Sequence, residues 1–209
     1  MRRIHFYHNT KDETHCYQAS LRMILKYFLP HENFTFKQLD VMTGKKEGLW
    51  SWIMQGAIAL KKRGFEIKDI ESFDYKSFLH SPKEYLHTLA SKDVVDTWIQ
   101  YSDIEAEKRN AEKFIKEVEF EKRQPHYRDI IDLLGKKYLL ICNINIKTLN
   151  RKMGYAGHFV LIFRATEHTI WLHDPGLPPR KKRRVTRRVF EEAWAYPNEK
   201  AKNIVAFKR

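Results

Sequence analysis

Apolar residues in the first third of the chain recur every three or four positions, which is the period of amphipathic helices. The first predicted helix ends before Pro30 and the third at Gly64, because proline and glycine commonly stop helices. Thr35 is suited to cap the second helix, which ends at Gly44. The predicted helices cover residues 15–29, 35–42 and 49–63, and a short strand follows at 65–70.

Residues 74–135 differ from the segments on either side, because they are highly charged and keep apolar residues at helical spacing. The predicted helices of this block begin at Ser81-Pro82, Asp93, Asp103 and Pro125. No repeat or low-complexity linker separates the block from the rest of the chain. We therefore expect a single domain over residues 1–209, in which 74–135 is a helical insertion packed on the core.

The last third of the chain is dominated by short runs of apolar, β-branched and aromatic residues, which indicate buried strands. The predicted strands cover residues 138–146, 158–165, 169–173 and 203–207, with a helix at about 186–195. Helices first and strands afterwards are typical of an α+β domain. The sequence therefore predicts N-terminal helices packed on an antiparallel β-sheet.

The composition is that of a packed globular protein, with 43% hydrophobic and 13% aromatic residues. No apolar run approaches the ~18–20 residues that a membrane-spanning helix needs. The first residues, Met1–Phe6, lack the apolar core of a signal peptide. We therefore expect no membrane span, a cytoplasmic location, and no disulfide between Cys16 and Cys142.

The formal net charge of +13 is concentrated in a run of seven basic residues within nine positions. They are Arg180, Lys181, Lys182, Arg183, Arg184, Arg187 and Arg188. Such a run is suited to bind an anionic partner, such as nucleic acid or an acidic peptide, or to act as a nuclear-import signal. The other interpretation, which we favour, is a solvated loop and strand edge, since charge runs are usually solvated. Recognisable nucleic-acid-binding motifs are missing from the sequence.

Three short motifs carry candidate chemistry. Cys16 stands at the head of the first predicted helix, where a thiol's pKa falls. His158 follows Gly157 at the start of a predicted strand, and Asp174 ends the next strand, before Pro175. A cysteine, a histidine and a carboxylate are the parts of a nucleophile, its base and the group that orients the base. The leading hypothesis is a thiol enzyme of the papain type.

Each residue also has a structural interpretation. Cys16 could be a buried helix cysteine, His158 a core histidine, and Asp174 a turn residue, because Asp-Pro readily starts turns. A metal site that adds His173 is disfavoured, because His173 and Asp174 are adjacent in a strand and point to opposite faces. We therefore expect neither a metal nor a cofactor.

The motifs resemble the bacteriocin-leader-processing (double-glycine) cysteine peptidases, a branch of the papain-like superfamily. The similarity lies in the cysteine-headed helix from Cys16, in Gly157-His158-Phe159-Val160-Leu161, and in Asp174-Pro175, and it covers roughly residues 5–70 and 138–176. The resemblance implies a papain-like fold with Cys16 as nucleophile, His158 as general base and acid, and Asp174 as orienter.

Two positions depart from that family. The residue after the cysteine is often glycine and here is Tyr17. Family members also usually carry a glutamine six residues before the cysteine as an oxyanion donor. This chain has Thr10 there, preceded by Asn9, so these two residues are the candidates for the oxyanion site. The expected function is a thiol hydrolase, a cysteine peptidase acting on a peptide or another acyl substrate. The alternatives are a binding module with little or no turnover that uses the basic surface, and an acyltransferase.

Overall fold

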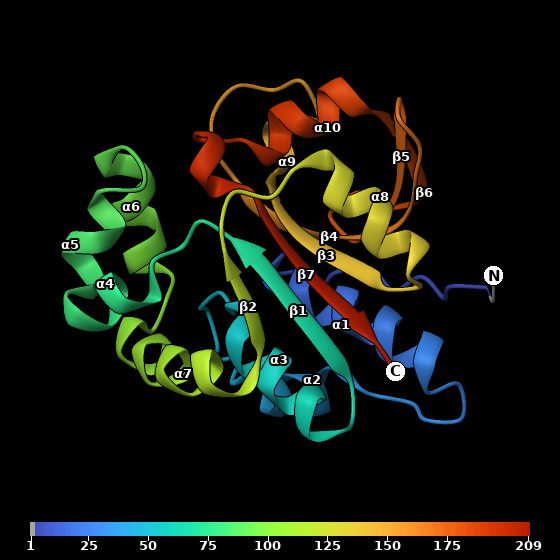
Figure 1. Cartoon of the computed structure of the whole chain (residues 1–209), viewed down its shortest axis with the longest axis horizontal. Helices are drawn as coiled ribbons and strands as arrows, with labels where there is room; N and C mark the ends of the chain where they lie inside the picture. Colours follow the sequence, from blue (N-terminus) through green and yellow to red (C-terminus); the bar gives the residue numbers. More distant parts are fainter. Residues whose placement is uncertain (1–2) are drawn as a thin grey trace.

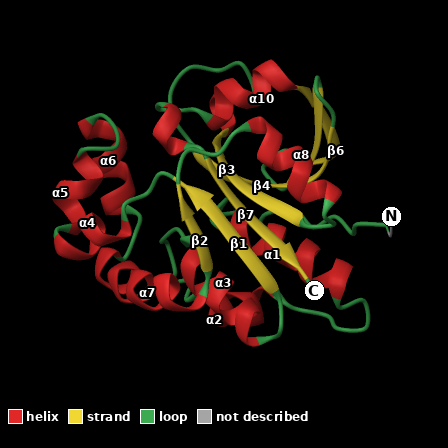
Figure 2. Ribbon diagram, viewed as in Figure 1, coloured by secondary structure: helices red, strands yellow, loops and turns green. Residues whose placement is uncertain are grey.

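The computed structural model describes residues 3–209 and shows an α+β fold. Within the described residues, ten α-helices and one short 3₁₀ helix surround a single seven-stranded sheet (Figures 1 and 2). The helices are α1 (Cys16–Phe28), α2 (Phe36–Thr43), α3 (Ile53–Lys62), α4 (Tyr75–His80), α5 (Pro82–His87), α6 (Lys92–Gln100), α7 (Ile104–Glu117), α8 (Tyr127–Gly135), α9 (Ile146–Leu149) and α10 (Arg187–Trp194), with η1 at Glu199–Ala201.

The sheet has the order β2-β1-β7-β3-β4-β5-β6. Its strands are β1 (Glu66–Glu71), β2 (Glu119–Lys122), β3 (Leu139–Asn145), β4 (Gly157–Ala165), β5 (Thr169–Asp174), β6 (Arg180–Thr186) and β7 (Asn203–Lys208). Neighbouring strands are antiparallel except β1 and β2, which are parallel. The predicted α+β class is therefore confirmed, with a sheet that is mostly rather than wholly antiparallel.

Helices cover both faces of the sheet (Figure 2). The residues of the central strand β3 show why both faces are covered. Successive side chains of a strand point to opposite faces, and in β3 the side chains on both faces are apolar and buried. Leu139 and Ile141 belong to the hydrophobic core that includes α1, α3 and α7, whereas Leu140 and Cys142 belong to the core beneath α8 and α10. Cys142 is fully buried as a small hydrophobic residue, and both cysteines are free thiols.

The segment 74–135 was expected to be a helical insertion packed on the core, but part of it is a strand of the sheet. Four helices, α4 to α7, lie beside the β1–β2 edge of the sheet (Figure 1), but the chain then forms β2, which extends the sheet next to β1. The predicted helix running to about Phe120 instead ends at Glu117, and the Phe120 ring packs on Tyr75. The last helix of the segment, α8, packs on β3 and β4.

Two further boundaries differ from the prediction. Residues 49–52 are extended, because Trp50 stacks on Tyr101 and the Trp52 indole donates to Ser102, and α3 begins only at Ile53. The basic run, expected to be a loop and a strand edge, forms the edge strand β6 and the start of α10. Among the described helices, none is both long enough and apolar enough to cross a bilayer.

We predict that Gly56→Ala destabilises the protein although alanine is the better helix former. A Cβ on Gly56 in α3 would lie 2.4 Å from the hydroxyl of Tyr17, which is fully buried and bonded to the Ile53 carbonyl. The free-energy cost of overpacking should be larger than the gain in helix propensity, so the unfolding free energy should fall by about 1–2 kcal/mol. The matched control is Gly135→Ala in α8, where nothing lies within 4 Å of the added Cβ. Urea unfolding should show no loss for that control, and equal losses would contradict the packing argument.

Candidate active site

Cys16, His158 and Asp174 come from three elements that meet. Cys16 is the first residue of α1, which packs on β4, and His158 is the second residue of β4. Asp174 is the last residue of β5, and because β4 and β5 are antiparallel, the end of β5 lies near the start of β4. His158 Nε2 lies 2.9 Å from Asp174 Oδ1, and the two residues are 6% and 2% exposed.

The other ring nitrogen of His158 faces the thiol of Cys16. Burial raises the pKa of Cys16, but the hydrogen bond and charge of His158, with backbone hydrogen bonds from Phe159 and Tyr17, outweigh it and leave the pKa below that of an ordinary thiol. Burial lowers the pKa of His158, whereas its bonds to Asp174 and Cys16 raise it to about 9. The lowered pKa of Cys16 and the raised pKa of His158 both favour the thiolate–imidazolium form of the pair.

Asp174 is held by more than the imidazole. Its Oδ1 also accepts from the backbone N–H of Gly176 at 3.0 Å, and its Oδ2 accepts from Arg183 Nη1 at 2.8 Å. Burial raises the pKa of Asp174, but these partners and His158 outweigh it, so the pKa lies below its usual value. A Cβ on Gly176 would lie 3.0 Å from Asp174 Oδ1 and 3.3 Å from the His158 ring. A glycine here lets the backbone close over the pair.

Arg183 is not part of an anion-binding surface. Its side chain is only 11% exposed and bridges Asp174 to the carbonyl of Leu149, which Nη2 reaches at 2.9 Å. The strand register explains this position, since β6 pairs with β5 beside the end that carries Asp174. Arg183 therefore supports the candidate catalytic residues from behind.

The remaining basic residues of the run fall into two groups. Arg187 and Arg188, at the start of α10, pair with Glu191 and Glu192 one turn later. The four residues that stay exposed on the edge strand β6 are Arg180, Lys181, Lys182 and Arg184. Their placement fits the solvated strand edge favoured by the sequence, where charges also discourage pairing with another sheet.

Asn9 and Thr10, the two oxyanion candidates, have different surroundings. Asn9 is 2% exposed; its backbone N–H donates to the Pro175 carbonyl, and its Oδ1 accepts from the backbone N–H of His15 at 2.7 Å. Asn9 thus joins the start of α1 to the Asp174 turn, and its amide NH₂ has no acceptor within residues 3–209. The hydroxyl of Thr10 is bonded to Asp12 and His15 instead. Asn9 is the better placed donor.

His173 points away from this site, as its position next to Asp174 in β5 requires. It is 1% exposed between the rings of Phe6 and Phe163, and its Nδ1 accepts from the backbone N–H of Lys182. Burial lowers the pKa of His173 to about 4, so it is a neutral core residue. In the described part of the chain, no three histidine, cysteine or acidic residues are arranged to hold a metal ion.

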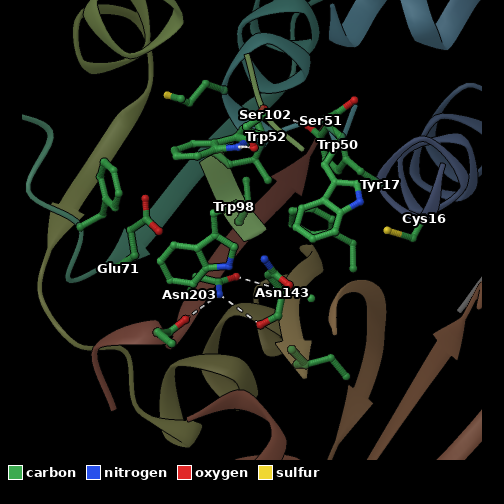
Figure 3. Close-up of a pocket in the computed structure, with 18 of the residues that line it drawn as sticks. Cys16, Tyr17, Trp50, Ser51, Trp52, Glu71, Trp98, Ser102, Asn143 and Asn203 are labelled. Carbon is green, nitrogen blue, oxygen red and sulfur yellow. Dashed lines mark hydrogen bonds between the residues drawn. The ribbon is translucent and has the colours of Figure 1, made fainter. Parts of the chain in front are cut away.

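A cavity of about 230 Å³ extends from Cys16 towards the α4–α7 helices. Figure 3 shows Trp50, Tyr17 and Trp98 between Cys16 at one end and Glu71 at the other. Glu71 and Trp98 could not be placed near the site from the sequence, because they lie in the segment 71–137, which the resemblance does not cover. A Cβ on Gly157 would lie 2.7 Å from the Tyr155 hydroxyl, so the missing side chain leaves no open space there.

A comparison of the chain with known protein families and with curated proteins finds no match. The assignment of a function therefore depends on the geometry described above.

We predict that Arg183→Met lowers the unfolding free energy at pH 7 by roughly 2–3 kcal/mol. The loss should be less than for a wholly unpaired buried charge, because Asp174 keeps His158 and Gly176. The matched control is Arg184→Met, one residue along β6 and exposed, which should change stability by less than about 0.5 kcal/mol. Urea unfolding of both variants measures the difference, and equal effects would show that Arg183 does not support Asp174.

Proposed function

We propose that this protein is a papain-like thiol hydrolase, a cysteine peptidase in which Cys16, His158 and Asp174 form the catalytic triad. The observation that carries the proposal is the continuous, buried chain of interactions from the thiolate through the imidazole to Asp174. The similarity of the three motifs to the double-glycine cysteine peptidases supports the same assignment.

In the proposed reaction, the Cys16 thiolate attacks the carbonyl carbon of an acyl substrate and forms a carbon–sulfur bond. The imidazolium of His158 then gives its proton to the leaving amine as the carbon–nitrogen bond breaks. Asp174 keeps the ring oriented and stabilises its positive charge. A water molecule, deprotonated by His158, then cleaves the acyl-enzyme and restores the thiolate. In the acyltransferase alternative, an amine takes the place of this water.

Two donors are suited to stabilise the oxyanion that forms during attack. The backbone N–H of Cys16 is at the first position of α1, where helical N–H groups lack an intrahelical acceptor. The amide NH₂ of Asn9 is the second, since only the oxygen of that side chain is used by the protein. Asn9 would thus replace the glutamine that the related peptidases use, one residue further from the cysteine.

A second candidate function is a binding module of the same fold that holds an anionic partner. The observation that favours it is the row of four exposed basic residues on β6, none of which forms an ion pair within residues 3–209. Arg184 also lies over the ring of Trp171, 5.8 Å from its centroid. The reactivity of Cys16 separates the two functions, because a pure binding module needs no activated thiolate.

We predict that iodoacetamide at pH 6 alkylates Cys16 at least about tenfold faster than an ordinary thiol, because its pKa is lowered. Cys142 should stay unlabelled, since burial raises its pKa. With the pKa of His158 raised to about 9, the imidazolium persists up to that pH, so the Cys16 rate should be flat from neutral pH to about pH 9. Peptide mapping of the labelled protein measures both sites.

His158→Ala is the control for this experiment. Without the imidazolium, the alkylation rate of Cys16 at pH 6 should fall and should then rise with pH as for a free thiol. Equal and slow labelling of Cys16 and Cys142 in the native protein would instead favour the binding module.

We also predict that p-nitrophenyl acetate gives a burst of p-nitrophenolate equal to the amount of Cys16, which Cys16→Ala abolishes. Asn9→Ala should slow the acylation step by about two to three orders of magnitude by removing an oxyanion donor. Thr10→Ala is the matched control and should leave the rate nearly unchanged, because its hydroxyl is bonded to Asp12 and His15. Iodoacetamide labelling should stay fast in both variants. A slow rate in Thr10→Ala alone would assign the donor to Thr10.

A further inference from the structure

The cavity that begins at Cys16 has aromatic walls. Its aromatic lining residues are Tyr17, Trp50, Trp52, Phe73, Tyr75, Trp98, Tyr155, Phe159 and Tyr196. The indole N–H groups of Trp52 and Trp98 donate to Ser102 and Tyr155, both at 2.9 Å, which fixes the two rings in place. Ring faces carry a negative quadrupole and attract cations, most strongly at tryptophan.

The end of the cavity away from Cys16 carries a carboxylate (Figure 3). Glu71, the last residue of β1, lines the cavity there and accepts a hydrogen bond from Tyr75 at 2.7 Å. Asp69 lies two residues earlier on the same face of β1 and is fully buried, where it shares hydrogen bonds with Glu71 and Tyr75. Two acids buried side by side, with no base among the groups that shift their pKa values, require an explanation.

Among residues 3–209, no base is near enough to shift the pKa of either acid. Burial raises the pKa of Glu71, and burial together with the Glu71 charge raises that of Asp69 well above its usual value. A third acid, Glu107, is also buried nearby: burial raises the pKa of Tyr17 in the cavity wall, and the charges of Glu107 and Asp69 raise it further. Among the described residues, the one base that lines the cavity is Lys200, which is exposed. In a protein with a formal net charge of +13, this interior is therefore acidic.

We propose that this cavity is the specificity site of the enzyme and receives a cationic side chain, a lysine or arginine of the acyl substrate, between the tryptophan rings and with its charge at Glu71. The proposal rests on the proposed function for its placement beside the reacting thiolate. The aliphatic stem of such a side chain fits the apolar walls, while its charged end meets the carboxylates.

An uncharged occupant fits the same walls less well. A purely apolar side chain would cover the Glu71 carboxylate without compensating its charge, which costs free energy in a buried site. An acidic side chain would add a like charge to the pair. A cation satisfies both the aromatic faces and the carboxylates, so discrimination between lysine and its uncharged isostere norleucine tests the idea directly.

The first experiment compares dipeptidyl chloromethyl ketones that carry lysine or norleucine at either position, with glycine at the other. In the reaction, the Cys16 thiolate displaces chloride and becomes a thioether. At the favoured position we expect the lysine probe to alkylate Cys16 at least about tenfold faster than the norleucine probe. Equal rates, or a preference for norleucine at both positions, would overturn the proposal.

Glu71→Gln should bring the lysine-to-norleucine ratio close to one while leaving the iodoacetamide rate unchanged. Glutamine keeps the oxygen that accepts from Tyr75 and is isosteric with the protonated acid, so the fold should be retained. The matched control is Glu47→Gln, an exposed carboxylate in the loop before Trp50 that does not line the cavity. If Glu47→Gln lowers the ratio as much as Glu71→Gln, the preference reflects general electrostatics and the assignment to Glu71 is wrong.

A second measurement does not depend on catalysis. Three of the five tryptophans line the cavity, so intrinsic fluorescence of the Cys16→Ala chain reports its occupancy. Titration with N-acetyl-lysine methylamide should give saturable binding at least about tenfold tighter than N-acetyl-norleucine methylamide. If iodoacetamide shows no activated thiol but lysine still binds selectively, the thiol hydrolase fails and the cation site stands. If the thiol is activated but the lysine and norleucine compounds bind equally, the cation site fails and the thiol hydrolase stands.

Discussion

The burial of the Asp174 carboxylate is the constraint on which the candidate site depends. An ionised carboxylate in the interior must be hydrogen-bonded or paired, and Asp174 meets this requirement with His158, Gly176 and Arg183. Each partner comes from a different stretch: the start of β4, the turn after β5, and β6. The carboxylate therefore ties together the strands at this edge of the sheet, and it also keeps the imidazole charged beside Cys16.

The contacts of Asp174 with His158, and of His158 with Cys16, also explain how a partly buried thiol can have a lowered pKa. Removal from water disfavours the charged sulfur, and only the adjacent imidazolium and backbone donors reverse that preference. The imidazolium is in turn stabilised by its bonds to Asp174 and to Cys16, which outweigh the effect of burial. The three groups are therefore coupled in their titration. A substitution at Arg183, which does not contact the sulfur, can change the pKa of Cys16 through Asp174 and His158.

Much of the fold, and the meeting of Cys16, His158 and Asp174, could be predicted from the sequence, because both leave local signals. Periodicity predicted α1, α2, β3, β4, β5 and β7, and Thr35 indeed caps α2 with a capping box. The role of Arg183 could not be predicted, because the sequence of a basic run does not show which of its side chains is buried. β2 was missed because four residues paired in parallel with a distant strand carry no local pattern. The charged segment was expected to be a loop and a strand edge, and only the structure shows that Arg180–Thr186 form the edge strand β6.

Under the proposed function, the segment that the resemblance did not cover separates substrate selection from chemistry. The proposed triad depends on α1, β4, β5 and β6, whereas residues between Glu71 and Ser102 line much of the cavity beyond it. Since Trp98 is anchored on Tyr155, the residue two before Gly157, the two parts share a contact next to the catalytic strand. A family of chains with the same triad could therefore change what they accept by changing the α4–α7 helices alone, without disturbing the buried ion network that sustains the thiolate. The isolation of Asp174 from that helical block, with every partner on the C-terminal strands, is what would make such independence physically possible.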